Sequence, residues 1–71
     1  MEEISLREGD DYIKLGQLLK KANMMSSGLD AKMVILDGLV SVNGEVELRR
    51  GKKIYPGDVV TFEGESVKVV R

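Results

Sequence analysis

The spacing of apolar residues changes its period at Gly38, and this change restricts the fold more than any other feature of the sequence. Before Gly38, apolar side chains recur every three or four residues, which is typical of one side of a helix. After Gly38 they recur every second residue, which is typical of one face of a strand. The pattern therefore predicts two helices followed by a small, mostly antiparallel sheet of three to five short strands. A chain of 71 residues has room for one such α+β domain.

The two helices are expected over residues 14–23 and from Ser27 to Asp37. One apolar stripe marks the first helix at positions i, i+3, i+4 and i+7, formed by Leu15, Leu18, Leu19 and Ala22. Ser27-x-x-Asp30 has the form of a capping box at the start of the second helix, and Gly38 follows its end. The second helix has two apolar faces, one with Leu29, Met33 and Leu36 and the other with Ala31, Val34 and Ile35. We therefore expect it to contact the first helix on one side and the sheet on the other.

Three turns containing glycine divide the second half of the chain into strands. Asn43-Gly44 is the strongest short signal for a type I′ hairpin. Pro56-Gly57 predicts a type II turn, because proline sets the φ of the first central residue and glycine takes the positive φ of the second. A third turn is expected at Gly64-Glu65, before a last strand that contains Val67 and Val69.

Acidic residues are concentrated at the start of the chain. Residues 1–11 carry a net charge of −4 and residues 12–71 a net charge of +3, although the whole chain carries only −1. We therefore divide the chain into an acidic leader over 1–11 and a mildly basic domain over 12–71. Ile4 and Leu6 alternate with polar residues in the leader, which allows a short edge strand there. The field around a protein depends on where its charges lie, so the small net charge does not exclude an anionic ligand.

The chain contains neither cysteine nor histidine. This composition excludes disulfides, a thiolate zinc site and a cysteine nucleophile, and it removes the usual general base. No phosphate-cradling or dinucleotide-binding glycine motif is present. We therefore expect no enzymatic activity, no cofactor and no metal. The longest apolar run is Met33–Leu36, which is far too short to cross a bilayer, and the acidic start is unlike a secretory signal, so a cytoplasmic protein is expected.

Four segments of the chain resemble the S4-type RNA-binding domain, a module named after a small-subunit ribosomal protein. They are Leu15-x-x-Leu18-Leu19, then Ser26-Ser27 before a helix with Ala31 and Ile35, then Gly38-x-Val40-x-Val42-Asn43-Gly44, and finally Pro56-Gly57-Asp58-Val59-Val60. The match spans roughly residues 12–70, and segments 15–17, 28–32 and 49–53 are most similar to small stand-alone bacterial members. The resemblance implies the alpha-L RNA-binding motif, a helix pair packed beside a small twisted sheet. It also implies that RNA lies across the first helix, the start of the second helix and the hairpin that follows.

Basic side chains are the candidate RNA contacts. The densest cluster is the loop Arg49-Arg50-Gly51-Lys52-Lys53. Such a loop favours RNA binding, because each phosphate that a cation neutralises releases condensed counterions. Further lysines on the two helices would extend this patch. The predicted RNA-binding residues are therefore Lys14, Lys21, Lys32, Arg49, Arg50, Lys52 and Lys53. An ordinary solvated loop and solvated helix faces are the alternative interpretation of the same residues.

Only three aromatic residues are present, Tyr12, Tyr55 and Phe62. This scarcity favours a protein that recognises the shape and phosphates of structured RNA, such as ribosomal or transfer RNA, over one that stacks on many single-stranded bases. We expect it to act as a monomer. Two alternatives stay open: a protein-interaction module with the same fold, and a ribosome-associated assembly or quality factor that also contacts ribosomal protein. The acidic leader motivates the first alternative, as does Lys14-Leu15-Gly16, where many family members carry Arg-Leu-Asp.

Overall fold

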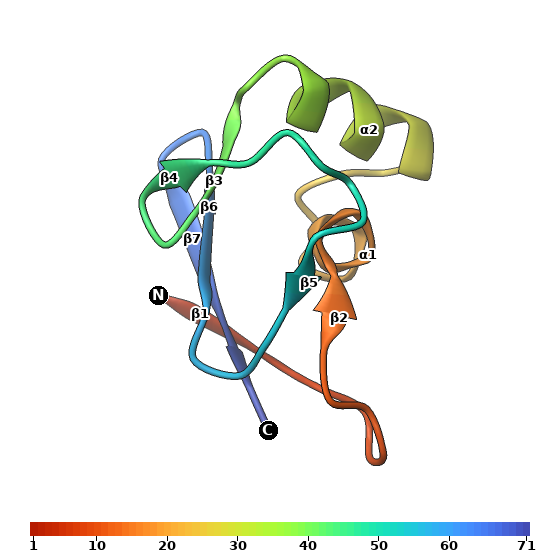
Figure 1. The fold of residues 1–71 in the computed structure, drawn as a ribbon, viewed down its shortest axis with the longest axis vertical. Coiled ribbons are helices and arrows are strands. Elements are labelled where there is room, and N and C mark those ends of the chain that lie inside the picture. Colours follow the sequence, from red (N-terminus) through yellow and green to blue (C-terminus); the bar gives the residue numbers. More distant parts are fainter.

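A helix pair and a five-stranded sheet face each other across one apolar core in the computed structural model, which describes residues 1–71 (Figure 1). The elements in chain order are β1 (Glu2–Ser5), β2 (Ile13–Lys14), α1 (Leu15–Lys21), α2 (Gly28–Leu36), β3 (Val40–Val42), β4 (Glu45–Val46), β5 (Lys53–Ile54), β6 (Val59–Phe62) and β7 (Glu65–Val70). This architecture confirms the α+β fold that the change of period predicts.

The main sheet has the strand order β1-β7-β6-β3-β4. All its neighbouring strands are antiparallel except β1, which pairs in parallel with β7. The edge strand expected in the acidic leader is therefore present, with Ile4 opposite Val69. A second sheet of two strands, β2 and β5, was not predicted. Each of these strands is only two residues long, so neither leaves a readable alternation in the sequence.

Backbone conformations confirm two of the three predicted turns. Asn43 and Gly44 have φ values of 52° and 86°, as a type I′ turn requires, and they connect β3 to β4. Gly57 has a φ of 96°, and the Asp58 N–H donates to the Tyr55 carbonyl at 3.0 Å, which closes the type II turn. The third turn lies one residue earlier than predicted: its central residues, between paired Phe62 and Glu65, are 63 and 64.

The helices begin and end close to the predicted residues. At the start of α2, the Ser27 hydroxyl accepts a hydrogen bond from the Asp30 N–H at 3.2 Å, which confirms the cap. Gly38 follows its end with a φ of 76°. The first helix is shorter than the predicted range 14–23, and Asn23 takes the left-handed conformation just beyond it, with a φ of 60°.

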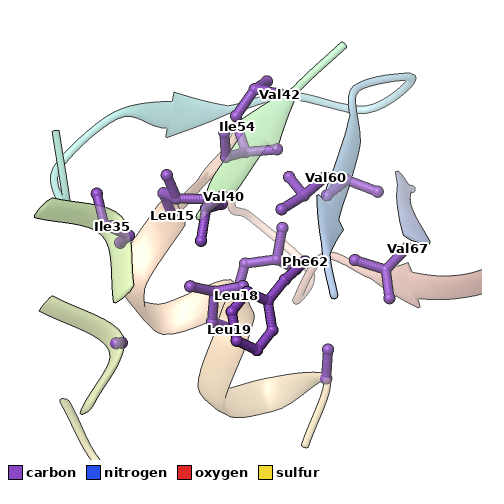
Figure 2. Packing of buried hydrophobic residues seen from close by; sticks show 13 residues of the cluster. Leu15, Leu18, Leu19, Ile35, Val40, Val42, Ile54, Val60, Phe62 and Val67 are labelled. Atoms are coloured by element: carbon purple, nitrogen blue, oxygen red, sulfur yellow. The ribbon is translucent and has the colours of Figure 1, made fainter. Parts of the chain in front are cut away.

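Thirteen buried apolar side chains form the core. They come from α1, α2, β5 and the sheet, and Figure 2 shows how those of α1 and the sheet converge. The cluster consists of Leu15, Leu18, Leu19, Ala22, Ala31, Ile35, Val40, Val42, Ile54, Val60, Phe62, Val67 and Val69. All four apolar residues of the predicted α1 stripe are among them. The helix pattern therefore identified the side of α1 that faces the core.

The expectation that both apolar faces of α2 make contacts was wrong. Ala31 and Ile35 are buried, and Val34 packs against the core. Leu29, Met33 and Leu36 on the other face are 67%, 55% and 60% exposed. The physical reason is that α2 lies at the margin of the fold (Figure 1), where no further layer covers its outer side. The inward and outward faces of α2 are therefore both apolar, although only one is needed for folding.

Core and outer-face leucines should differ sharply in their contribution to stability. Leu19 is fully buried, so Leu19→Ala should lower the free energy of unfolding by about 2–5 kcal/mol. Leu29→Ala is the matched control and should change it by less than about 0.5 kcal/mol, because Leu29 is already in solvent. Urea denaturation followed by circular dichroism measures both values. Equal losses would contradict the placement of Leu19 in the core and of Leu29 on the exposed face of α2.

Candidate nucleic-acid interface

Backbone hydrogen bonds attach the basic segment 49–53 to the start of α1. The N–H of Leu15 donates to the Lys52 carbonyl at 2.9 Å, and the N–H of Gly16 donates to the Arg50 carbonyl at 3.1 Å. A helix leaves its first N–H groups without partners inside the helix, and Lys14 supplies no side-chain cap. The carbonyls of the basic segment take over that role. The loop is thereby fixed against the helix, although it lies more than thirty residues further along the chain.

Gly16 allows Arg50 to lie directly across α1. A Cβ atom built on Gly16 would be 2.7 Å from the Arg50 Cγ and 3.3 Å from its Cδ, which is closer than real side chains approach. Any residue larger than glycine at this position would therefore displace the Arg50 side chain. Gly16 therefore has a structural role, because its lack of a side chain lets an arginine from the loop cover the helix.

A groove lies between α1, the start of α2 and the basic segment. Its lining, which has no apolar side chain, encloses about 360 Å³ and consists of Lys14, Gly16, Gln17, Lys20, Gly28, Arg50 and Gly51. None of the chain's three ion pairs includes the groove cations Lys14, Lys20 or Arg50. The groove thus offers three cationic side chains and a glycine-rich backbone, with no carboxylate in its lining.

Two of the seven predicted site residues, Lys14 and Arg50, lie in this groove. Lys20 lies there as well, and the sequence analysis missed it. The signal that could have identified it is its spacing: Lys20 is four residues after Gly16, which places both on the same side of α1.

Lysines face each other directly where β2 pairs with β5. Lys14 and Lys53 are register partners in this antiparallel pair, and like charges at such positions destabilise a sheet. Part of the cost is offset because the Lys53 ammonium lies 4.9 Å from the centre of the Tyr12 ring, in a cation–π contact. This strand pair thus concentrates positive charge beside the start of α1.

Arg49 differs from Arg50 in having an internal partner. Its Nε and Nη2 donate to the Glu47 carboxylate at 3.1 and 3.4 Å, and its backbone N–H donates to the same carboxylate at 3.1 Å. The hydrogen bond from Arg49 lowers the pKa of Glu47 below its ordinary value of 4.5, and Glu47 in turn raises the pKa of Arg49. Arg49 is therefore held outside the groove with its charge largely compensated.

The remaining predicted residues lie on other parts of the surface. The Lys21 ammonium donates to the Ser5 carbonyl at 2.9 Å, which ties α1 to β1. Lys32 is exposed on α2, and no hydrogen bond or ion pair joins it to the groove. Lys52 and Lys53 line a neighbouring hollow on the outer side of the loop, together with Arg49. The structure therefore brings together only part of the predicted patch.

Two of the five acids of the leader form ion pairs. Asp10 lies 3.7 Å from Arg7, and Asp11 lies 3.8 Å from Arg71. No ion pair joins the leader to the groove. The chain contains no group of three or more acidic side chains placed to hold a metal ion, and neither helix has the length and apolar character needed to cross a membrane.

This combination of a helix pair, a small sheet and a cationic groove is typical of a nucleic-acid-binding domain. A family model described as the S4 domain matches residues 4–70, and the chain belongs to that family.

Two relatives and the solved structure of one of them support the assignment. "Putative RNA-binding protein YbcJ" of Escherichia coli (strain K12) is 44% identical over 59 residues, which cover 83% of this chain and 84% of YbcJ. "Probable ribosome maturation protein RlbA" of Bacillus subtilis (strain 168) is 48% identical over 54 residues, which cover 76% of each chain. The solution structure of YbcJ, described as containing an αL motif involved in RNA-binding, has a TM-score of 0.73 and 41% identity, and covers 100% of this chain and 89% of its own.

The Glu47–Arg49 contact should be visible in the titration of Glu47. In the wild-type protein the pKa of this carboxyl should lie below 4.5, and in Arg49→Gln it should return toward 4.5, because the main cause of the shift is removed. Carboxyl chemical shifts followed by NMR across an acid titration measure both values. Since the folded-state pKa is depressed, the stabilisation from this contact is complete above about pH 5 and is lost as the pH falls through the folded-state pKa. Identical Glu47 titrations in the two proteins would contradict the contact.

Proposed function

We propose that this protein is a non-enzymatic RNA-binding protein that recognises structured RNA through the groove. The observation that carries the proposal is the meeting of Lys14, Lys20 and Arg50, which come from two separate parts of the chain, in a lining free of carboxylates. RNA presents closely spaced phosphates, and cations that neutralise them release bound counterions. Family membership and the RNA-binding description of the YbcJ structure support the same function.

The groove suits a phosphate backbone in both charge and shape. Arg50 can donate two parallel N–H bonds to one phosphate, whereas Lys14 and Lys20 act as point charges. Three of the seven lining residues are glycines, so the RNA backbone can approach the protein backbone closely. None of these contacts selects a base. The expected mode is therefore recognition of phosphate positions and helical shape.

Ribosomal RNA is the RNA class that we favour, with transfer RNA as the alternative. The B. subtilis relative is described as a ribosome maturation protein and is 48% identical over 76% of this chain. A function on ribosomal RNA would place the protein in the cytoplasm, where it would bind as a monomer.

Reversal of a groove charge should weaken RNA binding more than the same reversal elsewhere. Arg50→Glu should reduce affinity for a structured rRNA fragment roughly 10- to 100-fold, because it removes a charge-assisted hydrogen bond and adds a repulsion. Lys68→Glu is the matched control, since it changes the net charge equally from an exposed position on β7. Filter binding at several salt concentrations measures both. With about four to six phosphate contacts, the wild-type slope of log K against log salt should be about −3 to −5.

Two results would contradict this assignment. Equal losses in Arg50→Glu and Lys68→Glu would show a dependence on net charge alone, without a site. A wild-type salt slope near zero would show that phosphate neutralisation does not drive binding. The melting temperature of Arg50→Glu serves as the folding control, because the Arg50 side chain is exposed and should contribute little to stability.

A second candidate function is supported by the apolar residues that the fold leaves in solvent. We define the apolar surface as six side chains that are 54–67% exposed: Leu29, Met33, Leu36, Leu39, Val46 and Leu48. A Cβ atom built on Gly38 would lie 3.8 Å from the Val46 side chain, so the end of α2 and β4 are neighbours. Large exposed apolar side chains on neighbouring elements commonly mark a protein-binding site.

We infer that this surface binds a protein with an apolar centre and a basic rim. Four acids are sequence neighbours of the apolar side chains, against the two cations Lys32 and Arg49, so the local charge is negative; the acids are Asp30, Asp37, Glu45 and Glu47. Ribosomal proteins, which must neutralise RNA, are a class with such rims. An assembly factor needs both RNA and protein contacts, and the groove and the apolar surface would supply one each.

Removal of the apolar surface should separate the two contacts. Met33→Ser combined with Leu36→Ser should leave affinity for an isolated rRNA fragment unchanged and should weaken binding to purified ribosomal subunits several-fold. Cosedimentation with the subunits measures the second quantity, and light scattering of the free protein tests for self-association through the same surface. Unchanged binding to the subunits, or a wild-type dimer that the double variant abolishes, would contradict a ribosomal protein partner.

A further inference from the structure

A second cationic hollow lies on the outer side of the basic segment. Its lining consists of Arg49, Gly51, Lys52, Lys53 and Tyr55, and it encloses about 530 Å³. Gly51 belongs to the lining of this hollow and also to that of the groove. The two sites are therefore neighbours separated by one thin loop. This outer hollow differs from the groove because it includes an aromatic ring.

Tyr55 is held in place by its backbone, although its side chain reaches solvent. Its N–H donates to an Asp58 carboxylate oxygen at 2.8 Å, and its carbonyl accepts from the Asp58 N–H at 3.0 Å. The other carboxylate oxygen of Asp58 accepts from the Asn43 side-chain amide at 3.0 Å, which anchors the turn to the β3–β4 hairpin. The backbone of Tyr55 is consequently fixed before any ligand binds, so a contact would add no ordering cost for the turn itself.

The ring of Tyr55 has no structural task that explains its exposure. It is 47% exposed and does not belong to the core cluster. Its one aromatic neighbour is Tyr12, with ring centroids 5.8 Å apart and planes tilted by 51°. The Lys53 ammonium makes its cation–π contact with the Tyr12 ring and not with the Tyr55 ring. No hydrogen bond within the chain uses the Tyr55 hydroxyl. The exposed Tyr55 ring thus shares a hollow with Lys52 and Lys53, neither of which forms an ion pair within the chain.

We propose that Tyr55 is a stacking platform for one unpaired nucleobase of the RNA whose phosphates the groove binds. Every base has a π-face, and an exposed aromatic ring beside cations is the arrangement by which proteins hold unstacked bases. Bases inside a duplex already stack on their neighbours, so the ligand is a nucleotide in a bulge, a loop or an end. Lys52 and Lys53 contact the phosphates that flank it. The scarcity of aromatic residues agrees with this role, because one platform serves one base.

The proposal rests on the proposed function and makes it more specific: the preferred RNA combines a duplex with an adjacent unpaired nucleotide. The test uses the whole protein and two RNAs, a perfect 20-base-pair duplex and the same duplex with one unpaired 2-aminopurine. The wild-type protein should bind the second RNA about 5- to 150-fold more tightly, which is the range that aromatic stacking on one base provides. Binding should also quench the 2-aminopurine fluorescence.

Three variants at one position separate stacking from other effects. Tyr55→Ala should abolish both the preference and the quenching while keeping the wild-type affinity for the perfect duplex. Tyr55→Phe should retain both, because it keeps the ring and loses only the hydroxyl. Tyr55→Leu keeps apolar bulk without a π-face and should behave like the alanine variant. The leucine variant also serves as a control in case the smaller alanine side chain disrupts the fold. Circular dichroism checks the fold of each variant.

The results distinguish failure of this inference from failure of the proposed function. If the wild-type protein binds both RNAs equally, the platform is overturned and RNA binding by the groove stands. If it binds neither RNA, both are overturned. Retention of the preference in Tyr55→Leu would replace stacking with simple apolar contact and overturn the proposal. Loss of the preference in Tyr55→Phe would also overturn the proposal, because it would show that the Tyr55 hydroxyl contacts the RNA through a hydrogen bond.

Discussion

The hydrogen bonds between the first turn of α1 and the carbonyls of residues 50 and 52 hold the fold and its surface features together. They satisfy N–H groups that a helix start leaves open, and they do so with a segment distant in sequence. Because Gly16 has no side chain, the two backbones can approach while Arg50 lies between helix and solvent. The same contact therefore caps a helix, closes the β2–β5 pair and positions one wall of the groove.

Charge is distributed so that paired and unpaired cations have different roles. Arg7, Arg49 and Arg71 each have a carboxylate of the protein within 4.0 Å, whereas Arg50 has none. The pairing of Lys14 with Lys53 across two short strands opposes folding, and a fold of this size has little stability to spare. The repulsion between the two lysines would be relieved in the proposed complex, where an RNA phosphate neutralises their charge. The net charge of the chain is a poor guide to this site, since compensated arginines and uncompensated lysines contribute to it equally.

Small size also explains the apolar surface. A chain of 71 residues buries thirteen apolar side chains in one core and has no further layer to cover the outer face of α2. The six side chains of the apolar surface, three of them on α2, consequently remain in contact with water. In the proposed function these residues are a second binding surface beside the RNA groove. Partner binding would then contribute the burial that the isolated fold does not provide.

The sequence by itself determined the two helices, the strands of the main sheet, two of the three turns and the inward side of α1, because periodicity and turn chemistry act over a few residues. The alternation at Val40 and Val42, and the Asn43-Gly44 pair, fixed the hairpin locally. The family resemblance on the same residues was equally readable, and the match of residues 4–70 to the S4 domain confirms it.

Only the tertiary structure decided which charged and apolar side chains remain free to contact a binding partner. Arg49 and Arg50 are adjacent in sequence, yet one binds Glu47 and the other lines the groove beside Lys20. In the sequence, the two apolar faces of α2 look equally suited to the core. Because the helix lies at the margin of the fold, one face is buried in the core and the other is exposed to solvent. These outcomes depend on contacts between segments far apart in the chain, and a local pattern carries no information about such contacts.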